Sequence, residues 1–125
     1  MLFRSTGVCA LYTAMEIEQW LGVPVNEGHT SGPDGTACQW EATSADDAFV
    51  QIQVINDTSY WEKPDLAPGY RALENVGKEG YASKEGTGWK AGALTDTAVV
   101  VVEIQGGKAN EASAIGLLRG TVDSL

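Results

Sequence analysis

The fold is decided at residues 49–55, which read Phe49-Val50-Gln51-Ile52-Gln53-Val54-Ile55. Apolar and amide side chains alternate here with a period of two, which is typical of a strand that buries one face. Apolar stretches bounded by turn-forming residues predict four more strands, at 37–42, 80–84, 88–94 and 98–105. Short turns at 43–47, 85–87 and 95–97 separate these strands, so the sheet should be antiparallel.

The first helix should begin at Thr13, which starts a capping box. Thr13 and Glu16 have the spacing of a capping box, in which each side chain bonds the other residue's backbone amide. Gly22 is a natural stop, because glycine readily takes the left-handed conformation that ends helices. Three apolar residues between these signals share one face: Ile17, Trp20 and Leu21.

A last helix should open at Asn110. Its apolar residues recur at helical spacing, and the stripe consists of Ile115, Leu118, Val122 and Leu125, widened by Leu117. Packing against the core is the expected role of this stripe, with an exposed partner-binding face as the alternative. A third, short helix is predicted at 69–75, whereas 26–36 and 56–68 are rich in turn-forming residues and should be loops.

These elements predict one α+β domain over residues 1–125, an antiparallel sheet of about five strands with helices packed on one face. A weak internal repeat accompanies them. Trp40-Glu41-Ala42 leads through an acidic turn to an apolar strand, and Trp89-Lys90-Ala91 does the same. A duplicated helix–hairpin unit would explain this pattern, and so would ordinary hairpin chemistry.

The net charge of the chain limits which classes of binding partner are expected. The 125 residues carry a net charge of −9, and the pI is about 4.4. This field repels phosphate backbones and anionic lipids, so nucleic acid is not an expected partner. Cationic small molecules or basic protein surfaces fit better, although a merely solvated acidic surface would show the same composition. No apolar run approaches the roughly 20 residues that span a bilayer, and no motif calls for a cofactor.

The first eight residues lack the charged start and apolar stretch of a secretory signal. Either the protein is cytoplasmic, or the sequence is that of a mature or shortened chain.

The two cysteines allow three arrangements. A bridge between Cys9 and Cys38 would tie the entry of the first helix to the first strand and stabilise the fold by roughly 3 kcal/mol. Two reduced, buried thiols are the second arrangement. The third is a zinc site from both cysteines with His29 and Asp34, but no ligand spacing such as a CxxC pair supports it, so no metal is expected.

His29 is the only histidine, so any Ser-His-Asp or Cys-His mechanism must use it. It lies in a glycine-rich loop, where a solvated surface histidine is the ordinary outcome. A small hydrolase or isomerase that pairs His29 with a carboxylate is therefore an alternative function and not the preferred one.

The loop at 57–65 is the other candidate site. Carboxylates surround an aromatic pair there, and a ring face beside a negative charge attracts ammonium groups. The pair is Tyr60 and Trp61, and the carboxylates are those of Asp57, Glu62 and Asp65. A surface loop held down by one aromatic side chain would also explain the pattern.

Four short motifs occur in order along the chain: Cys9-Ala10-Leu11-Tyr12-Thr13, Leu21-Gly22-Val23-Pro24-Val25, Cys38-Gln39-Trp40 and Val76-Gly77-Lys78-Glu79-Gly80-Tyr81. Together they resemble the actinobacterial envelope lipoproteins that share a domain of unknown function. The resemblance implies that the cysteines pair and that the domain lies outside the cytoplasm. It implies no catalytic residues, because that family carries no assigned activity. The chain departs from the family in showing no signal or lipid-attachment region.

The preferred hypothesis is a non-enzymatic, exported binding domain for a small cationic or aromatic ligand or a protein partner. Its site would lie between the loop bearing His29 and the loop bearing Tyr60 and Trp61. The third hypothesis is a structural, homo-oligomeric module that associates through residues 99–102 or through the last helix.

Overall fold

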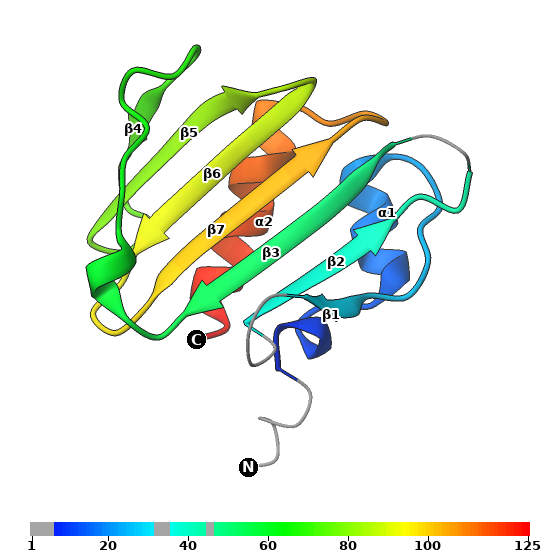
Figure 1. The fold of residues 1–125 in the computed structure, drawn as a ribbon, viewed down its shortest axis with the longest axis horizontal. Coiled ribbons are helices and arrows are strands. Elements are labelled where there is room, and N and C mark those ends of the chain that lie inside the picture. Colours follow the sequence, from blue (N-terminus) through cyan, green and yellow to red (C-terminus); the bar gives the residue numbers. More distant parts are fainter. Residues whose placement is uncertain (1–6, 32–35, 45–46) are drawn as a thin grey trace.

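The computed structural model describes residues 7–31, 36–44 and 47–125. Its centre is a seven-stranded antiparallel sheet with the order β1-β2-β3-β7-β6-β5-β4 (Figure 1). The strands are β1 (His29–Ser31), β2 (Ala37–Glu41), β3 (Phe49–Ile55), β4 (Arg71–Leu73), β5 (Glu79–Glu85), β6 (Gly88–Leu94) and β7 (Val99–Gln105). The helices are α1 (Ala14–Leu21) and α2 (Glu111–Asp123), with 3₁₀ turns η2 (Gly7–Ala10) and η4 (Thr58–Tyr60). The predicted α+β class with an antiparallel sheet is confirmed.

The sheet has seven strands and not five, because a three-residue strand is added at each edge. β1 forms inside the predicted loop 26–36, and β4 replaces the helix predicted at 69–75. Each edge strand pairs with a long neighbour, β2 or β5, and this pairing overrides weak local propensity. The predicted helix that would have preceded the second hairpin of the internal repeat is therefore not formed at 69–75.

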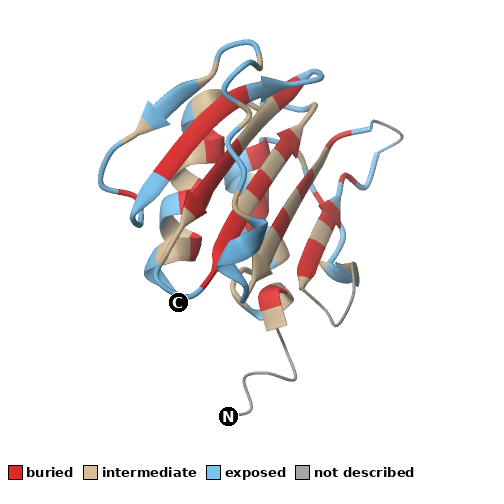
Figure 2. Ribbon diagram, turned by 60° about the vertical axis from the view of Figure 1, so that its left-hand side comes forward, coloured by how far each residue is buried: buried red, intermediate tan, exposed pale blue. Residues whose placement is uncertain are grey.

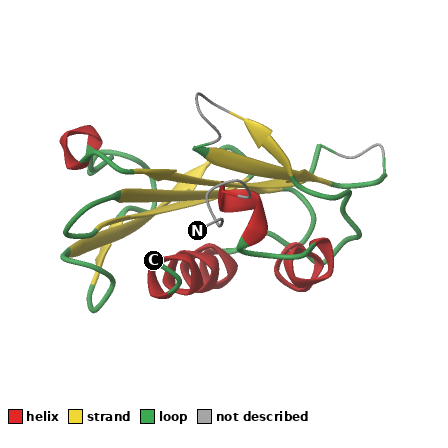
Figure 3. Ribbon diagram, turned by 90° about the horizontal axis from the view of Figure 1, so that it is seen from below, coloured by secondary structure: helices red, strands yellow, loops and turns green. Residues whose placement is uncertain are grey.

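Both α-helices lie on the same side of the sheet, and η4 lies on the other (Figure 3). Four central strand residues that face the helices are fully buried, namely Val50, Ile52, Val100 and Val102. Buried and partly exposed residues alternate along the central strands (Figure 2). This is the period-two pattern that residues 49–55 predict.

The predicted start and end of α1 are confirmed. Thr13 Oγ1 accepts from the Glu16 amide at 3.1 Å, and Glu16 Oε1 accepts from the Thr13 amide at 2.8 Å. Gly22 follows in the left-handed conformation, with φ of 83°. Ile17 and Leu21 are fully buried, and Trp20 remains 37% exposed.

Helix α2 begins as predicted, since the Asn110 side chain accepts from the Ser113 amide at 2.8 Å. Its buried face is rotated from the predicted stripe and consists of Ser113, Ala114, Leu117, Leu118 and Thr121. Leu125 lies beyond the helix end and is 58% exposed. Among the described residues, no helix is long and apolar enough to cross a membrane.

Cys9 and Cys38 form a disulfide, with their Cα atoms 5.1 Å apart. It joins η2 to β2, so the predicted bridge is confirmed and neither thiol is free. Cys38 is fully buried beside Trp40, in the core under the helices. The bridge thus anchors the segment that leads into α1 to the sheet.

Candidate functional site

The face of the sheet opposite the helices presents polar side chains. On this face a row crosses six strands, because each member is the register partner of the next: His29, Gln39, Gln51, Glu103, Lys90 and Ser83. Most of these residues are partly exposed, whereas in β2, β3 and β7 their neighbours along the strand are buried in the core. We call this surface the uncovered face, because neither α-helix lies over it (Figure 3).

The two loops expected to form one site lie at opposite sides of the uncovered face. His29 is in edge strand β1, and Trp61 contacts Tyr81 of β5. Strands β2, β3, β7 and β6 separate them. At about 4.8 Å per strand, His29 and the Trp61 region are roughly 24 Å apart. The structure therefore does not bring His29 together with Tyr60 and Trp61.

His29 lies near one carboxylate. Its Nε2 is 3.7 Å from Glu41 Oε1, longer than a hydrogen bond, and 56% of the His29 side chain is exposed. Gln39 Nε2 donates to the other Glu41 oxygen at 3.1 Å. Cys38 is closed in the disulfide and cannot act as a nucleophile. This geometry gives no support to a hydrolase or isomerase built on His29.

Residues 56–70 form a strap over the β5 side of the uncovered face. Two of its rings contact Tyr81, with centroids 5.7 Å away for Trp61 and 6.0 Å for Tyr70. Tyr81 is only 2% exposed. Burial, reinforced by the nearby Glu85 carboxylate, raises the pKa of Tyr81 to about 12. The aromatic residues of the strap thus cover the sheet with a small cluster.

The charged residues of the strap are already engaged or fully solvated. Lys63 Nζ pairs with Glu79 at 3.0 Å, and this contact raises the Lys63 pKa. Asp57 caps η4 by accepting from the Ser59 hydroxyl at 2.6 Å and the Ser59 amide at 3.0 Å, which lowers the Asp57 pKa.

The remaining residues predicted in this loop are exposed, namely Tyr60, Glu62 and Asp65. The strap thus has its own cation in Lys63, and Trp61 serves to hold it on the sheet.

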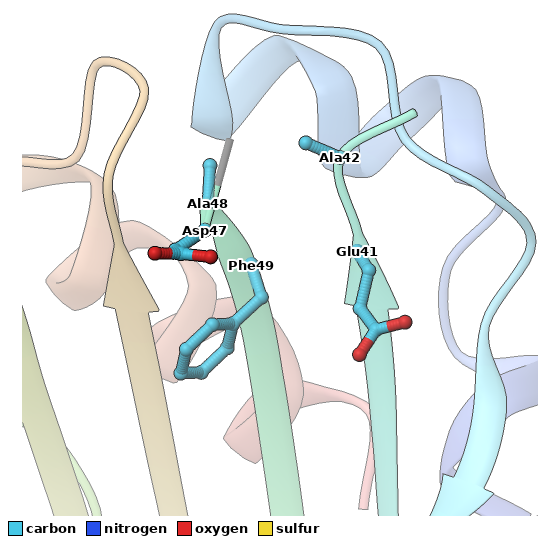
Figure 4. A pocket seen from close by; sticks show the side chains of 5 residues that line it. All are labelled: Glu41, Ala42, Asp47, Ala48 and Phe49. Carbon is cyan, nitrogen blue, oxygen red and sulfur yellow. The ribbon is translucent and has the colours of Figure 1, made fainter. Parts of the chain in front are cut away.

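A pocket of about 340 Å³ lies where β2 ends and β3 begins. We call it the hairpin-end pocket, and its lining residues are Glu41, Ala42, Asp47, Ala48 and Phe49 (Figure 4). Glu41 and Phe49 are direct cross-strand partners, so their side chains project on the same face of the sheet. Asp47 lies two residues before Phe49, at the entrance of β3.

The hairpin-end pocket combines negative charge with an aromatic ring. Within the described part of the chain, no lysine or arginine forms an ion pair with Glu41 or Asp47. Ala42 and Ala48, which also line the pocket, are buried, and Phe49 is half-buried. The carboxylates of Glu41 and Asp47 and the ring of Phe49 line the same pocket, and this combination suits a cationic group.

The sequence pattern predicts only a turn at residues 43–47. The signal that points to the pocket is the pairing of residue 41 with residue 49, which depends on the length of the turn between them.

No metal centre is evident among the residues that the structure describes. Over residues 7–31, 36–44 and 47–125, no group of three or more histidine, cysteine or acidic residues is placed to hold a metal ion. The zinc alternative fails for both cysteines, because a disulfide supplies no thiolate. Its fourth candidate, Asp34, lies outside the described residues.

No family model, curated protein sequence or solved structure matches the chain. The resemblance to actinobacterial envelope lipoproteins therefore remains a prediction that rests on the short motifs alone.

Proposed function

We propose that this domain is a non-enzymatic binding module for an organic cation, and that the hairpin-end pocket receives the cationic group. The observation that carries this proposal is the cross-strand pairing of Glu41 with Phe49, with Asp47 beside them at the pocket rim. A carboxylate attracts an ammonium or guanidinium group by charge, and the face of an aromatic ring attracts it further. The two effects act together only where ring and carboxylate share one face.

The charge of the whole chain supports the same ligand class. A net charge of −9 raises the local concentration of cations and repels anions. The pocket volume of about 340 Å³ falls in the range of small-molecule sites. The bound group could belong to a small amine or to an exposed lysine or arginine of another protein, since the recognising chemistry is the same.

The proposal also places the domain outside the cytoplasm. The Cys9–Cys38 bridge supports this location, because structural disulfides persist chiefly in oxidising compartments. In such a compartment the bridge would stay oxidised and would continue to stabilise the fold.

A titration followed by amide NMR shifts tests the proposal. Butylammonium chloride is the probe, 1-butanol is the uncharged control, and sodium chloride keeps the ionic strength constant. We expect saturable shifts at residues 41–42 and 47–49 with butylammonium and none with 1-butanol. A lysine-containing peptide competing for the same shifts would indicate a protein side chain as the natural ligand.

Replacing the ring separates recognition by the pocket from attraction by the overall charge. Phe49→Leu keeps an apolar side chain and every carboxylate, and we expect two- to fivefold weaker binding, about 0.5–1 kcal/mol of cation–ring attraction. Shifts that never saturate, or that spread evenly over the acidic surface, would overturn the proposal.

A further inference from the structure

A second pocket, of about 530 Å³, lies at the opposite ends of the central strands. It is bounded by the turn between β6 and β7, by the segment before β5 and by the end of α2. We call it the helix-end pocket. The hairpin-end pocket is near Gln105, which pairs with Phe49, whereas this one adjoins the start of β7 at Val99. A seven-residue strand puts about 20 Å between them, so the two pockets are separate.

Backbone contacts fix the walls of the helix-end pocket. The Lys78 amide donates to the Leu94 carbonyl at 2.7 Å. Gly77 precedes it with φ of 60°, and a side chain there would collide with the same carbonyl. Across the pocket, Thr95 Oγ1 accepts from the Ala98 amide at 3.0 Å and closes the β6–β7 turn. Lys78 and Asp96 therefore lie on two hydrogen-bonded segments that face each other across the pocket.

The side chains that line the pocket carry one charge of each sign. Lys78 Nζ lies 3.9 Å from Asp96 Oδ1, and these side chains are 62% and 89% exposed. A solvated pair at this distance contributes little to stability, so its members are available to a ligand. A simple anion would meet Asp96, and a simple cation would meet Lys78. A ligand with both charges would pair with both residues.

The remaining wall is apolar. Val122, from the last turn of α2, and Leu125, just beyond it, line the pocket beside the two charged residues. Leu125 is 58% exposed and Val122 is half-buried, so a ligand can bury further apolar surface on both side chains. Covering this surface favours an apolar group by about 25 cal/mol per Å².

We propose that the helix-end pocket binds a free α-amino acid with an aliphatic side chain. Lys78 receives the carboxylate, Asp96 receives the ammonium group, and Val122 and Leu125 contact the side chain. The pocket has ample volume for one such molecule. This site is independent of the cation site, because the two pockets share no lining residue.

Titration of the full chain with leucine, monitored by amide NMR shifts, tests this proposal. We expect saturable shifts at residues 77–78 and 95–97. Leucinamide lacks the carboxylate, N-acetylleucine lacks the ammonium group and glycine lacks the side chain, so each should bind at least about tenfold more weakly. Equal binding of leucine and leucinamide would overturn the proposal, and so would the absence of saturation with leucine.

Variants at exposed positions complete the test. Lys78→Gln and Asp96→Asn should each weaken leucine binding about tenfold, and Leu125→Ala by two- to fivefold. Exchanging the charges, with Lys78→Asp and Asp96→Lys together, should recover part of the affinity lost in either single variant. Glu27→Gln, at an exposed position that lines neither pocket, is the matched control and should leave leucine binding unchanged. Failure of butylammonium to bind the hairpin-end pocket would leave this result unaffected.

Discussion

The two faces of the sheet are built from the same strands and have opposite characters. Along β3, Val50 and Ile52 face the helices and are fully buried, while Gln51 and Gln53 face away and stay partly exposed. Along β7, Val100 and Val102 are buried and Glu103 is partly exposed. One face therefore holds the core, and the other holds the charged and polar groups that a partner can reach.

This difference separates stability from recognition. Burial of apolar surface dominates the helix-covered face, and each large side chain there contributes about 2–3 kcal/mol. Side chains of the uncovered face make solvated contacts, which contribute less than about 1 kcal/mol each. Neighbouring residues on one strand thus serve as matched pairs, because they share backbone environment and differ in the face they occupy.

The largest expected effect is at Trp40. Trp40→Ala leaves a cavity under the helices and should lower the free energy of unfolding by about 4 kcal/mol. Gln39→Ala, one residue away on the uncovered face, should change it by less than about 0.5 kcal/mol. Urea denaturation measures both values.

If Trp40→Ala does not fold, Ile52→Val with Gln51→Ala gives a milder pair, with an expected loss of about 1 kcal/mol for Ile52→Val. Equal losses within a pair would mean that the two faces do not differ as described.

The next effect concerns the bridge that fastens η2 to the helix-covered side. Replacing Cys9 and Cys38 together by alanine should cost about 3 kcal/mol of unfolding free energy. Chemical reduction of the unaltered protein should likewise lower the denaturation midpoint, because it opens the same bridge. Titration with a thiol reagent should find no free thiol in the native, unreduced protein, and two thiols would contradict the pairing.

Tyr81 lies on the uncovered face and is nevertheless buried, because the rings of the strap pack against it. Its pKa of about 12 exceeds the unfolded value of about 10, so the neutral phenol is favoured by folding. This contribution is complete below pH 10 and is lost as the pH rises from about 10 to 12, by roughly 2 kcal/mol. Tyr81→Phe should flatten that part of the stability profile, whereas Tyr60→Phe, at an exposed ring, should not. An unchanged profile in Tyr81→Phe would place the ring in solvent.

The smallest stability effect should come from the hairpin-end pocket. Glu41→Gln and Asp47→Asn alter exposed carboxylates that pair with no lysine or arginine among the described residues, so each should change the unfolding free energy by less than about 0.5 kcal/mol. Thermal melts at neutral pH provide the measurement. A larger loss would show that these groups support the fold and are not free for a ligand.

Much of the fold follows from local patterns in the sequence. The capping box at Thr13, the stop at Gly22 and the alternation over 49–55 are all decided within a few residues, and the structure confirms them. The edge strands β1 and β4 are not decided locally, because they depend on pairing with β2 and β5. The exposure of Leu125 depends likewise on where α2 ends.

The candidate site was harder to predict for the same reason. His29 and Trp61 both belong to loops with suggestive composition, yet the sheet order places four strands between β1 and β5. Glu41 and Phe49 are eight positions apart and become partners only through the register of β2 with β3. Composition can indicate an acidic binding surface, but register determines which carboxylate lies beside which ring.

The affinity of butylammonium for two charge-matched double variants tests the central claim most directly. Glu41→Gln/Asp47→Asn and Glu62→Gln/Asp65→Asn each change the net charge from −9 to −7, since −9 + 2 = −7. The first pair removes both carboxylates of the hairpin-end pocket, and the second removes two of the three carboxylates of the strap. We predict that calorimetric titration shows at least about tenfold weaker binding for the first pair and less than about twofold for the second. Equal losses in both variants, or a larger loss in the second, would contradict recognition at the hairpin-end pocket.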